Sequence, residues 1–145
     1  MQDEYHTAQG EQAEGPHPSE QRETRPISAS MEHRRAALNL VERAEQAVVA
    51  ALPRRVDEGA LADAVGATLP HLRYAFRTAR GASIYAALFD LRLRHARDVL
   101  AGDPSLAPAA AANFCGFGHL GNFRRAFRQR FGYDPAEAAD QGPAA

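Results

Sequence analysis

The sequence has one cysteine and no apolar run long enough to cross a membrane. The single thiol, Cys115, cannot close an internal disulfide, so nothing in the chain requires an oxidising compartment. A membrane helix needs about 18 consecutive apolar residues, and the chain shows neither such a run nor the basic-then-apolar start of a signal peptide. These absences predict a cytoplasmic protein without a membrane partner.

Lysine is absent as well, so all 17 basic residues are arginine. High-GC codon usage can explain this preference, and arginine also suits bidentate contacts with phosphate and guanine; composition alone leaves both explanations open. The net charge of −1 conceals a strong asymmetry. Residues 71–130 hold ten arginines and three aspartates, a balance of +7, whereas residues 1–33 hold seven acids and two arginines, a balance of −5. The C-terminal half is therefore basic.

At 145 residues and 45% hydrophobic content, the chain is long enough for one domain with a hydrophobic core. Residues 1–33 are rich in Gln, Glu, Ser, Pro and Gly and lack apolar periodicity, so burial cannot offset the entropy of ordering them. We therefore expect a disordered acidic tail at 1–33, a folded domain at 34–138 and a disordered C-terminus at 139–145.

Apolar periodicity and capping residues predict an all-α domain of about seven helices, with no credible strand. Proline or glycine follows most of the periodic segments, and Asp57, Thr68 and Ser83 are placed as N-caps. The main expected helical segments lie at about 34–52, 57–66, 68–81, 83–101, 108–115 and 116–130.

Two of these helices combine an apolar stripe with arginines on other faces. The third carries Leu72 and Phe76 at helical spacing, and the sixth carries Leu120, Phe123 and Phe127. Each follows a short helix and a glycine-bearing turn, which is the helix-turn-helix arrangement. Such a helix can pack on a core and present cations to a groove of DNA.

A spaced signature supports this interpretation. Its positions are Thr68, Leu72, Phe76 and Gly81, then Arg92-Leu93, Ala96 and Leu100, then Gly116-Phe117, Phe123, Phe127, Phe131-Gly132 and Pro135. On these residues, the stretch from about Leu38 to Glu137 resembles the DNA-binding domain of AraC/XylS-type bacterial transcription regulators. The resemblance implies two helix-turn-helix subdomains joined by a long linker helix, with one recognition helix of each subdomain in a major groove.

The resemblance also assigns DNA-binding positions. The base-facing residues it implies are Pro70, Arg73 and Tyr74 in the first recognition helix, and Gly121, Arg124 and Arg125 in the second. It implies phosphate contacts for Arg77 and Arg128, and His119 can either contact phosphate or cap the turn.

The chain departs from the family pattern at several positions. Pro70 and Gly121 stand where the family commonly has larger side chains that contact bases. The second helix should therefore dominate recognition. Ala87 and Pro108 also replace the family's usual residues. Alternatively, the arginines can form a face that is merely exposed to water, and Tyr74 can be a half-buried side chain that packs on its neighbours. Arg92 is expected to form a structural ion pair, with Asp90 or Asp98, rather than to contact DNA.

The sequence thus predicts a sequence-specific transcriptional regulator that binds double-stranded DNA, with RNA polymerase as a further candidate partner. No catalysis, cofactor or metal site is expected, because Cys115 and His119 are too few to form one. Residues 1–33 are too few for a small-molecule effector domain. The alternative is a decayed family member that acts as a protein–protein interaction module without DNA readout; Pro70 and Gly121 favour it, and the +7 block opposes it.

Overall fold

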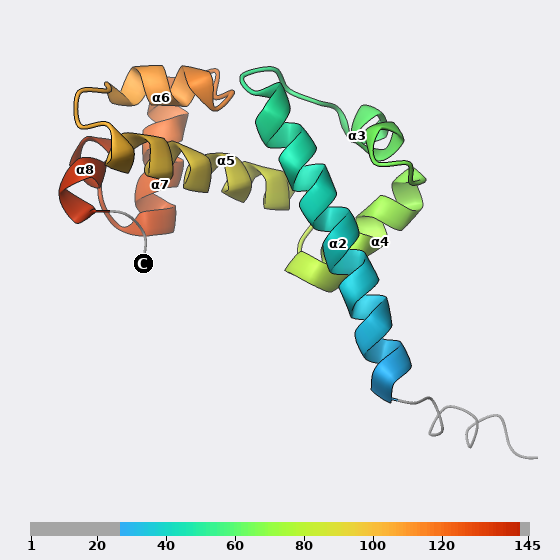
Figure 1. Cartoon of the computed structure of the whole chain (residues 1–145). Coiled ribbons are helices and arrows are strands. Elements are labelled where there is room, and N and C mark those ends of the chain that lie inside the picture. Colours follow the sequence, from blue (N-terminus) through green and yellow to red (C-terminus); the bar gives the residue numbers. More distant parts are fainter. Residues whose placement is uncertain (1–26, 143–145) are drawn as a thin grey trace, which may run out of the picture. The chain divides into compact units, whose positions relative to one another are not determined.

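The computed structural model describes residues 27–142, and every regular element within them is a helix (Figure 1). The expected tail at residues 1–26, and residues 143–145, lie outside the described residues. No described helix is both long and apolar enough to cross a bilayer. The elements are α2 (Ile27–Ala51), α3 (Glu58–Ala64), α4 (Leu69–Arg80), α5 (Ile84–Gly102), α6 (Pro108–Phe114), α7 (Leu120–Phe131), the short 3₁₀ helix η1 (Pro135–Glu137) and α8 (Ala138–Gln141).

Side-chain caps fix where three of these helices begin. At each start, a side-chain oxygen accepts a hydrogen bond from a backbone N–H that the first turn leaves without an intrahelical partner. The observed bonds run from Ala60 N to Asp57 Oδ1 (2.8 Å), from His71 N to Thr68 Oγ1 (3.3 Å) and from Ala86 N to Ser83 Oγ (3.2 Å). All three expected N-caps are confirmed.

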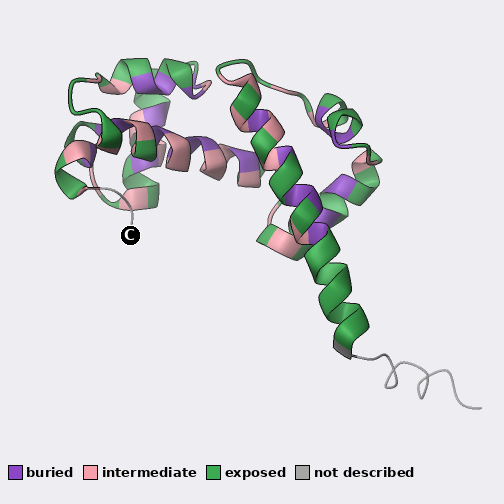
Figure 2. Cartoon of the chain, viewed as in Figure 1, coloured by how far each residue is buried: buried purple, intermediate pink, exposed green. Residues whose placement is uncertain are grey.

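From His33 onward the chain forms one unit with two hydrophobic cores. The first core joins α2, α3, α4 and the start of α5; the second joins the rest of α5 with α6, α7 and α8. Helix α5 belongs to both, because Ile84 and Leu88 are buried in the first core and Leu93, Ala96 and Leu100 in the second. Figure 2 shows the buried faces of these helices. The predicted fold, two helix-turn-helix subdomains on a shared linker helix, is confirmed.

Both outer boundaries of the folded region differ from expectation. Helix α2 begins at Ile27 rather than near residue 34, so residues 27–33, expected in the disordered tail, are helical. A helix nucleated by a packed stripe can extend at little cost through helix-compatible residues. At the other end, α8 runs to Gln141, where disorder was expected from residue 139, and Ala138 at its start is fully buried.

The turn between α6 and α7 approaches the loop between α2 and α3. Gly116 lies in this turn with φ of +83°, and a Cβ at this position would be 3.1 Å from the backbone oxygen of Pro53. Glycine is thus required here both by the backbone conformation and by the close approach. The contact joins the second helix-turn-helix subdomain to the first.

We expect Gly116→Ala to lower the free energy of unfolding more than substitution of any other turn glycine. The positive φ costs an L-residue about 1–2 kcal/mol, and overpacking against Pro53 adds about 1–3 kcal/mol. Urea denaturation monitored by circular dichroism measures the change.

Two control substitutions separate these contributions. Gly66 has φ of +70°, and a Cβ added there would have no neighbouring atom within 4 Å, so Gly66→Ala reports the conformational cost alone. Gly118 has no positive φ and equally open surroundings, so Gly118→Ala should be close to neutral. Equal losses for Gly116→Ala and Gly66→Ala would contradict a packed contact with Pro53.

Candidate nucleic-acid interface

Helix α4 separates an apolar face from a polar face. Leu72, Ala75 and Phe76 are buried in the first core. The four residues predicted to contact DNA from this helix are exposed and recur at positions that share the opposite face: Pro70, Arg73, Tyr74 and Arg77. The helix therefore presents one continuous surface that the core does not use.

Two of these exposed residues have partners on other helices. Arg73 Nη2 lies 3.5 Å from Glu58 Oε2 of α3, with the two side chains 59% and 38% exposed, so water screens the pair strongly. The Tyr74 hydroxyl lies 2.8 Å from His33 Nε2 of α2, and the two rings meet edge to face. Arg77 has no ion-pair partner among the described residues.

The sequence interpretation missed His33, because it was assigned to the disordered tail. A signal was available: His33 stands one turn before Ala37 and two turns before Leu40, both of which are buried. Extending that stripe toward the N-terminus places His33 on the packing side of α2. The contact with Tyr74 brings α2 to the edge of the exposed face of α4.

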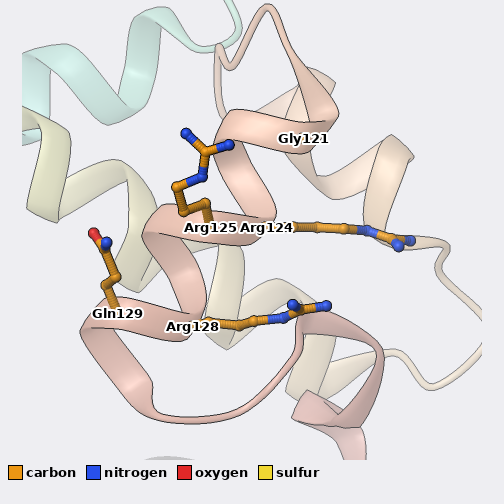
Figure 3. A pocket seen from close by; sticks show the side chains of 5 residues that line it. All are labelled: Gly121, Arg124, Arg125, Arg128 and Gln129. Atoms are coloured by element: carbon orange, nitrogen blue, oxygen red, sulfur yellow. The ribbon is translucent and has the colours of Figure 1, made fainter.

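Helix α7 presents the second cationic surface. Phe123 and Phe127 are fully buried beneath it. A shallow hollow of about 400 Å³ on the outside is lined by Gly121, Arg124, Arg125, Arg128 and Gln129. Figure 3 shows the Arg124 and Arg128 side chains extending in the same direction, whereas Arg125 and Gln129 extend from another side of the helix.

Arg128 has a carboxylate partner that the sequence interpretation did not assign. Its Nε and Nη2 donate to Asp134 Oδ2 at 3.0 and 2.5 Å. The other oxygen of Asp134 accepts from Ala136 N at 3.0 Å and caps η1. This backbone hydrogen bond first, and the one from Arg128 second, lower the pKa of Asp134 below its usual value. Arg124 and Arg125 form no salt bridge within residues 27–142, and the charge of Arg124 makes the smallest contribution to the lowered pKa of Asp134.

The start of α7 differs from expectation in two respects. His119 is the N-cap residue, but its side chain makes no capping hydrogen bond, so its turn-capping interpretation is wrong. Leu120, expected in the apolar stripe, is 39% exposed, whereas Phe117 and Phe123 on either side of it in the sequence are buried and contact each other. His119 and Gly121 are both exposed beside Leu120.

The prediction that Arg92 forms an ion pair with Asp90 or Asp98 is wrong. Within the described residues, Asp90 pairs with Arg94 and Arg130, and Asp98 pairs with Arg97. Arg92 is instead only 6% exposed, and its Nε has no hydrogen-bond partner there. Burial, and then the like charge of Arg55, lower the pKa of its guanidinium. Because this side chain is inside the fold, it is not available for a DNA contact.

Cys115 is a free cysteine buried in the second core. Burial raises the pKa of its thiol to about 11, so the thiol is protonated at neutral pH and a poor nucleophile. Within the described residues, no group of three or more His, Cys, Asp or Glu side chains could hold a metal ion.

Comparison with known proteins now identifies the family. A family model described as a helix-turn-helix domain matches residues 61–141. A crystal structure from Rhodopseudomonas palustris CGA009, described as a probable AraC family transcriptional regulator, is 31% identical with a TM-score of 0.59, and the match covers 73% of this chain and 99% of that chain. The chain belongs to the AraC family.

A second AraC-type structure supports the fold alone. It is a transcriptional regulator from Chromobacterium violaceum, of the AraC-type DNA-binding domain-containing proteins, and is 23% identical with a TM-score of 0.64. The match covers 74% of this chain and 92% of that chain. A search of curated proteins finds no match. The region matched by the AraC-type family model includes α4 and α7 and thus both arginine-bearing faces.

The hydrogen bond from Ala136 N to Asp134, and after it the bond from Arg128, predict that Asp134 makes a pH-dependent contribution to stability. The pKa of Asp134 is lowered in the folded chain, so its stabilising effect is present above the unfolded pKa of about 3.9 and is lost as pH falls through the lower folded value. Asp134→Asn should lower the free energy of unfolding by up to about 1 kcal/mol at pH 7.

Urea denaturation of both proteins at pH 7 and pH 3 measures this effect, and the difference should shrink at the lower pH. Asp140→Asn is the matched control, because Asp140 has no ion-pair partner among the described residues. A difference that grows as the pH falls would contradict the assignment.

Proposed function

We propose that this AraC family chain is a sequence-specific regulator of transcription that binds double-stranded DNA through α4 and α7, each reading one major-groove segment. The observation that carries the proposal is the outer face of α7. There, Arg124 and Arg125 stand beside the exposed Gly121, opposite two buried phenylalanines, with no carboxylate partner in the described chain. Cations held on a rigid helix without acidic partners are suited to a polyanion.

The arginines divide into two chemical roles. The planar guanidinium groups of Arg124 and Arg125 can each form paired hydrogen bonds with guanine O6 and N7 in the major groove. Arg77 and Arg128 supply phosphate contacts that fix register without reading sequence. His119 stands at the start of α7, where its exposed ring can add a further phosphate contact.

Helix α4 contributes less to specificity than α7. Pro70 has no side-chain donor, Arg73 shares its charge with Glu58, and the hydroxyl of Tyr74 is engaged by His33. Gly121 likewise offers α7 no reading group, but it leaves space beside Arg124 and Arg125 for the edge of a base pair. The second recognition helix therefore carries most of the sequence discrimination.

The proposal places the chain in the bacterial cytoplasm, with RNA polymerase as a further candidate partner. It includes no catalytic step and no cofactor. A second candidate function, protein interaction without DNA readout, is favoured by one observation. Tyr85 is 66% exposed and stacks on Phe89, and both residues line a hollow of about 420 Å³ between α5 and α7.

Salt dependence distinguishes the two candidates. Fluorescence anisotropy would be measured with a duplex selected by the chain from a random library, at several salt concentrations. For DNA binding, the logarithm of the association constant should fall linearly with the logarithm of salt concentration, with a slope of about −0.9 for each phosphate neutralised. Absent or salt-independent binding would favour the interaction module.

Single substitutions test the division of roles. We expect Arg124→Ala and Arg125→Ala each to cost about 1–3 kcal/mol, mostly as lost discrimination between selected and unrelated duplexes. Arg73→Ala should cost less. Arg77→Ala should weaken binding to all duplexes alike and reduce the salt slope by about 1. Arg128→Ala should do the same to a smaller extent, because Asp134 already pairs with Arg128 in the free chain.

Arg54→Ala is the charge-matched control, because Arg54 is exposed in the loop between α2 and α3 and outside both recognition helices. Competition titrations with selected and unrelated duplexes give the specificity ratios. A loss for Arg54→Ala as large as that for Arg124→Ala would indicate only a diffuse positive charge.

A further inference from the structure

A continuous series of ion pairs ends on both recognition helices. At the end of α4, Arg80 Nε donates to Glu45 Oε1 of α2 at 3.1 Å. The second oxygen of the same carboxylate, Oε2, lies 3.6 Å from Arg94 Nη2 of α5. Glu45 therefore joins the first recognition helix to the linker helix.

The series continues along α5 to the second recognition helix. Arg94 Nε donates to Asp90 Oδ2 at 3.1 Å, one turn away on the same helix. The other oxygen of Asp90, Oδ1, accepts from Arg130 Nε of α7 at 2.5 Å. Each carboxylate thus bridges two guanidinium groups through separate oxygens, and the cross-link spans α4, α2, α5 and α7.

Glu45 is the most protected member of the series. Its side chain is 12% exposed, whereas Asp90 and Arg94 are each 37% exposed and Arg130 is 45% exposed. Ion pairs removed from water are screened less than exposed pairs, and two partners restrain one carboxylate at a smaller entropic cost per pair. The cross-link should therefore depend most strongly on Glu45.

The two recognition helices pack on different cores, and α5 is the element common to both. A shared helix fixes their separation, but bending and rotation about it remain possible. Contacts from α2 and α7 onto α5 oppose those motions. On DNA the angle between the helices matters, because one inserted base pair rotates the second half-site by about 34–36° around the duplex axis.

We propose that Glu45 is a positioning residue that fixes the angle between α4 and α7, and with it the spacing of the two half-sites that the chain accepts. The inference rests on the proposed function of reading two groove segments. Glu45 itself contacts no DNA in this proposal; it acts through Arg80 on one side and through Arg94, Asp90 and Arg130 on the other.

Glu45→Gln in the full chain tests the proposal, because it preserves side-chain size and removes the charge. Binding would be measured by anisotropy with the duplex selected by the unsubstituted chain, and with versions carrying one base pair more or fewer between the half-sites. We expect the unsubstituted chain to prefer its own spacing about tenfold or more, and Glu45→Gln to reduce that ratio about threefold.

Glu58→Gln is the matched control. It also removes a glutamate that pairs with an arginine of α4, but that pair lies within the first subdomain. Its spacing ratio should equal that of the unsubstituted chain. A general loss of stability or affinity would affect all three duplexes equally and leave the ratio unchanged.

A measurement without DNA separates failure of this proposal from failure of the proposed function. Spin labels would be attached at Thr78→Cys on α4 and Gln129→Cys on α7, both exposed positions, whereas the native Cys115 is buried. Glu45→Gln should broaden the distance distribution obtained by double electron–electron resonance, and Glu58→Gln should not.

If Glu45→Gln fails to fold, Asp90→Asn, which breaks the series at a more exposed carboxylate, replaces it in both measurements. An unchanged spacing ratio together with an unchanged distance distribution in a folded variant would overturn the role of Glu45. The distance distribution can also broaden in Glu45→Gln while the selected duplex shows no two-part site. That result would support the cross-link and overturn the proposed function of reading two groove segments.

Discussion

The packing of α5 into two separate hydrophobic cores is the constraint on which the rest of the fold depends. Its first turns complete the core beneath α4, and its later turns complete the core beneath α7. Because one helix serves both cores, a change in the packing of α4 or of α7 acts on an element that also supports the other. The close approach of Gly116 to Pro53 adds a backbone contact between the same two subdomains. From His33 onward, the described chain is therefore better regarded as one unit with two arginine-bearing faces than as two independent modules.

Charge is distributed to suit that unit. Arginines that face inward or along α5 are paired with carboxylates or buried, as Arg94 and Arg92 are. On the outside of α7, by contrast, Arg124 and Arg125 lack carboxylate partners in the described chain. The arginines thus fall into those that cross-link helices through carboxylates, such as Arg94, and those without a salt bridge in the described chain, such as Arg124 and Arg125.

Local signals predicted most of the fold. Asp57, Thr68 and Ser83 cap helices as expected, because capping depends on neighbours within three residues. Contacts between distant segments were harder to infer. Neither the pairing of Tyr74 with His33, 41 positions apart, nor that of Arg130 with Asp90, 40 apart, follows from periodicity. The wrong ion pair predicted for Arg92 has the same origin. Proximity in the sequence suggests an aspartate as partner, but the direction of the side chain on the helix and its burial determine whether the pair forms.

The ion pair between Arg128 and Asp134 has a consequence for the phosphate contact proposed for Arg128. When the chain is away from DNA, the carboxylate occupies the guanidinium in the manner of a phosphate oxygen. Binding to a backbone phosphate would then exchange one anion for another. The net contribution of Arg128 to the free energy of binding would be small on every DNA sequence. In the proposed function that contact is the same on every duplex, so the exchange lowers the affinity for selected and unrelated DNA by the same factor and leaves the discrimination by Arg124 and Arg125 unchanged.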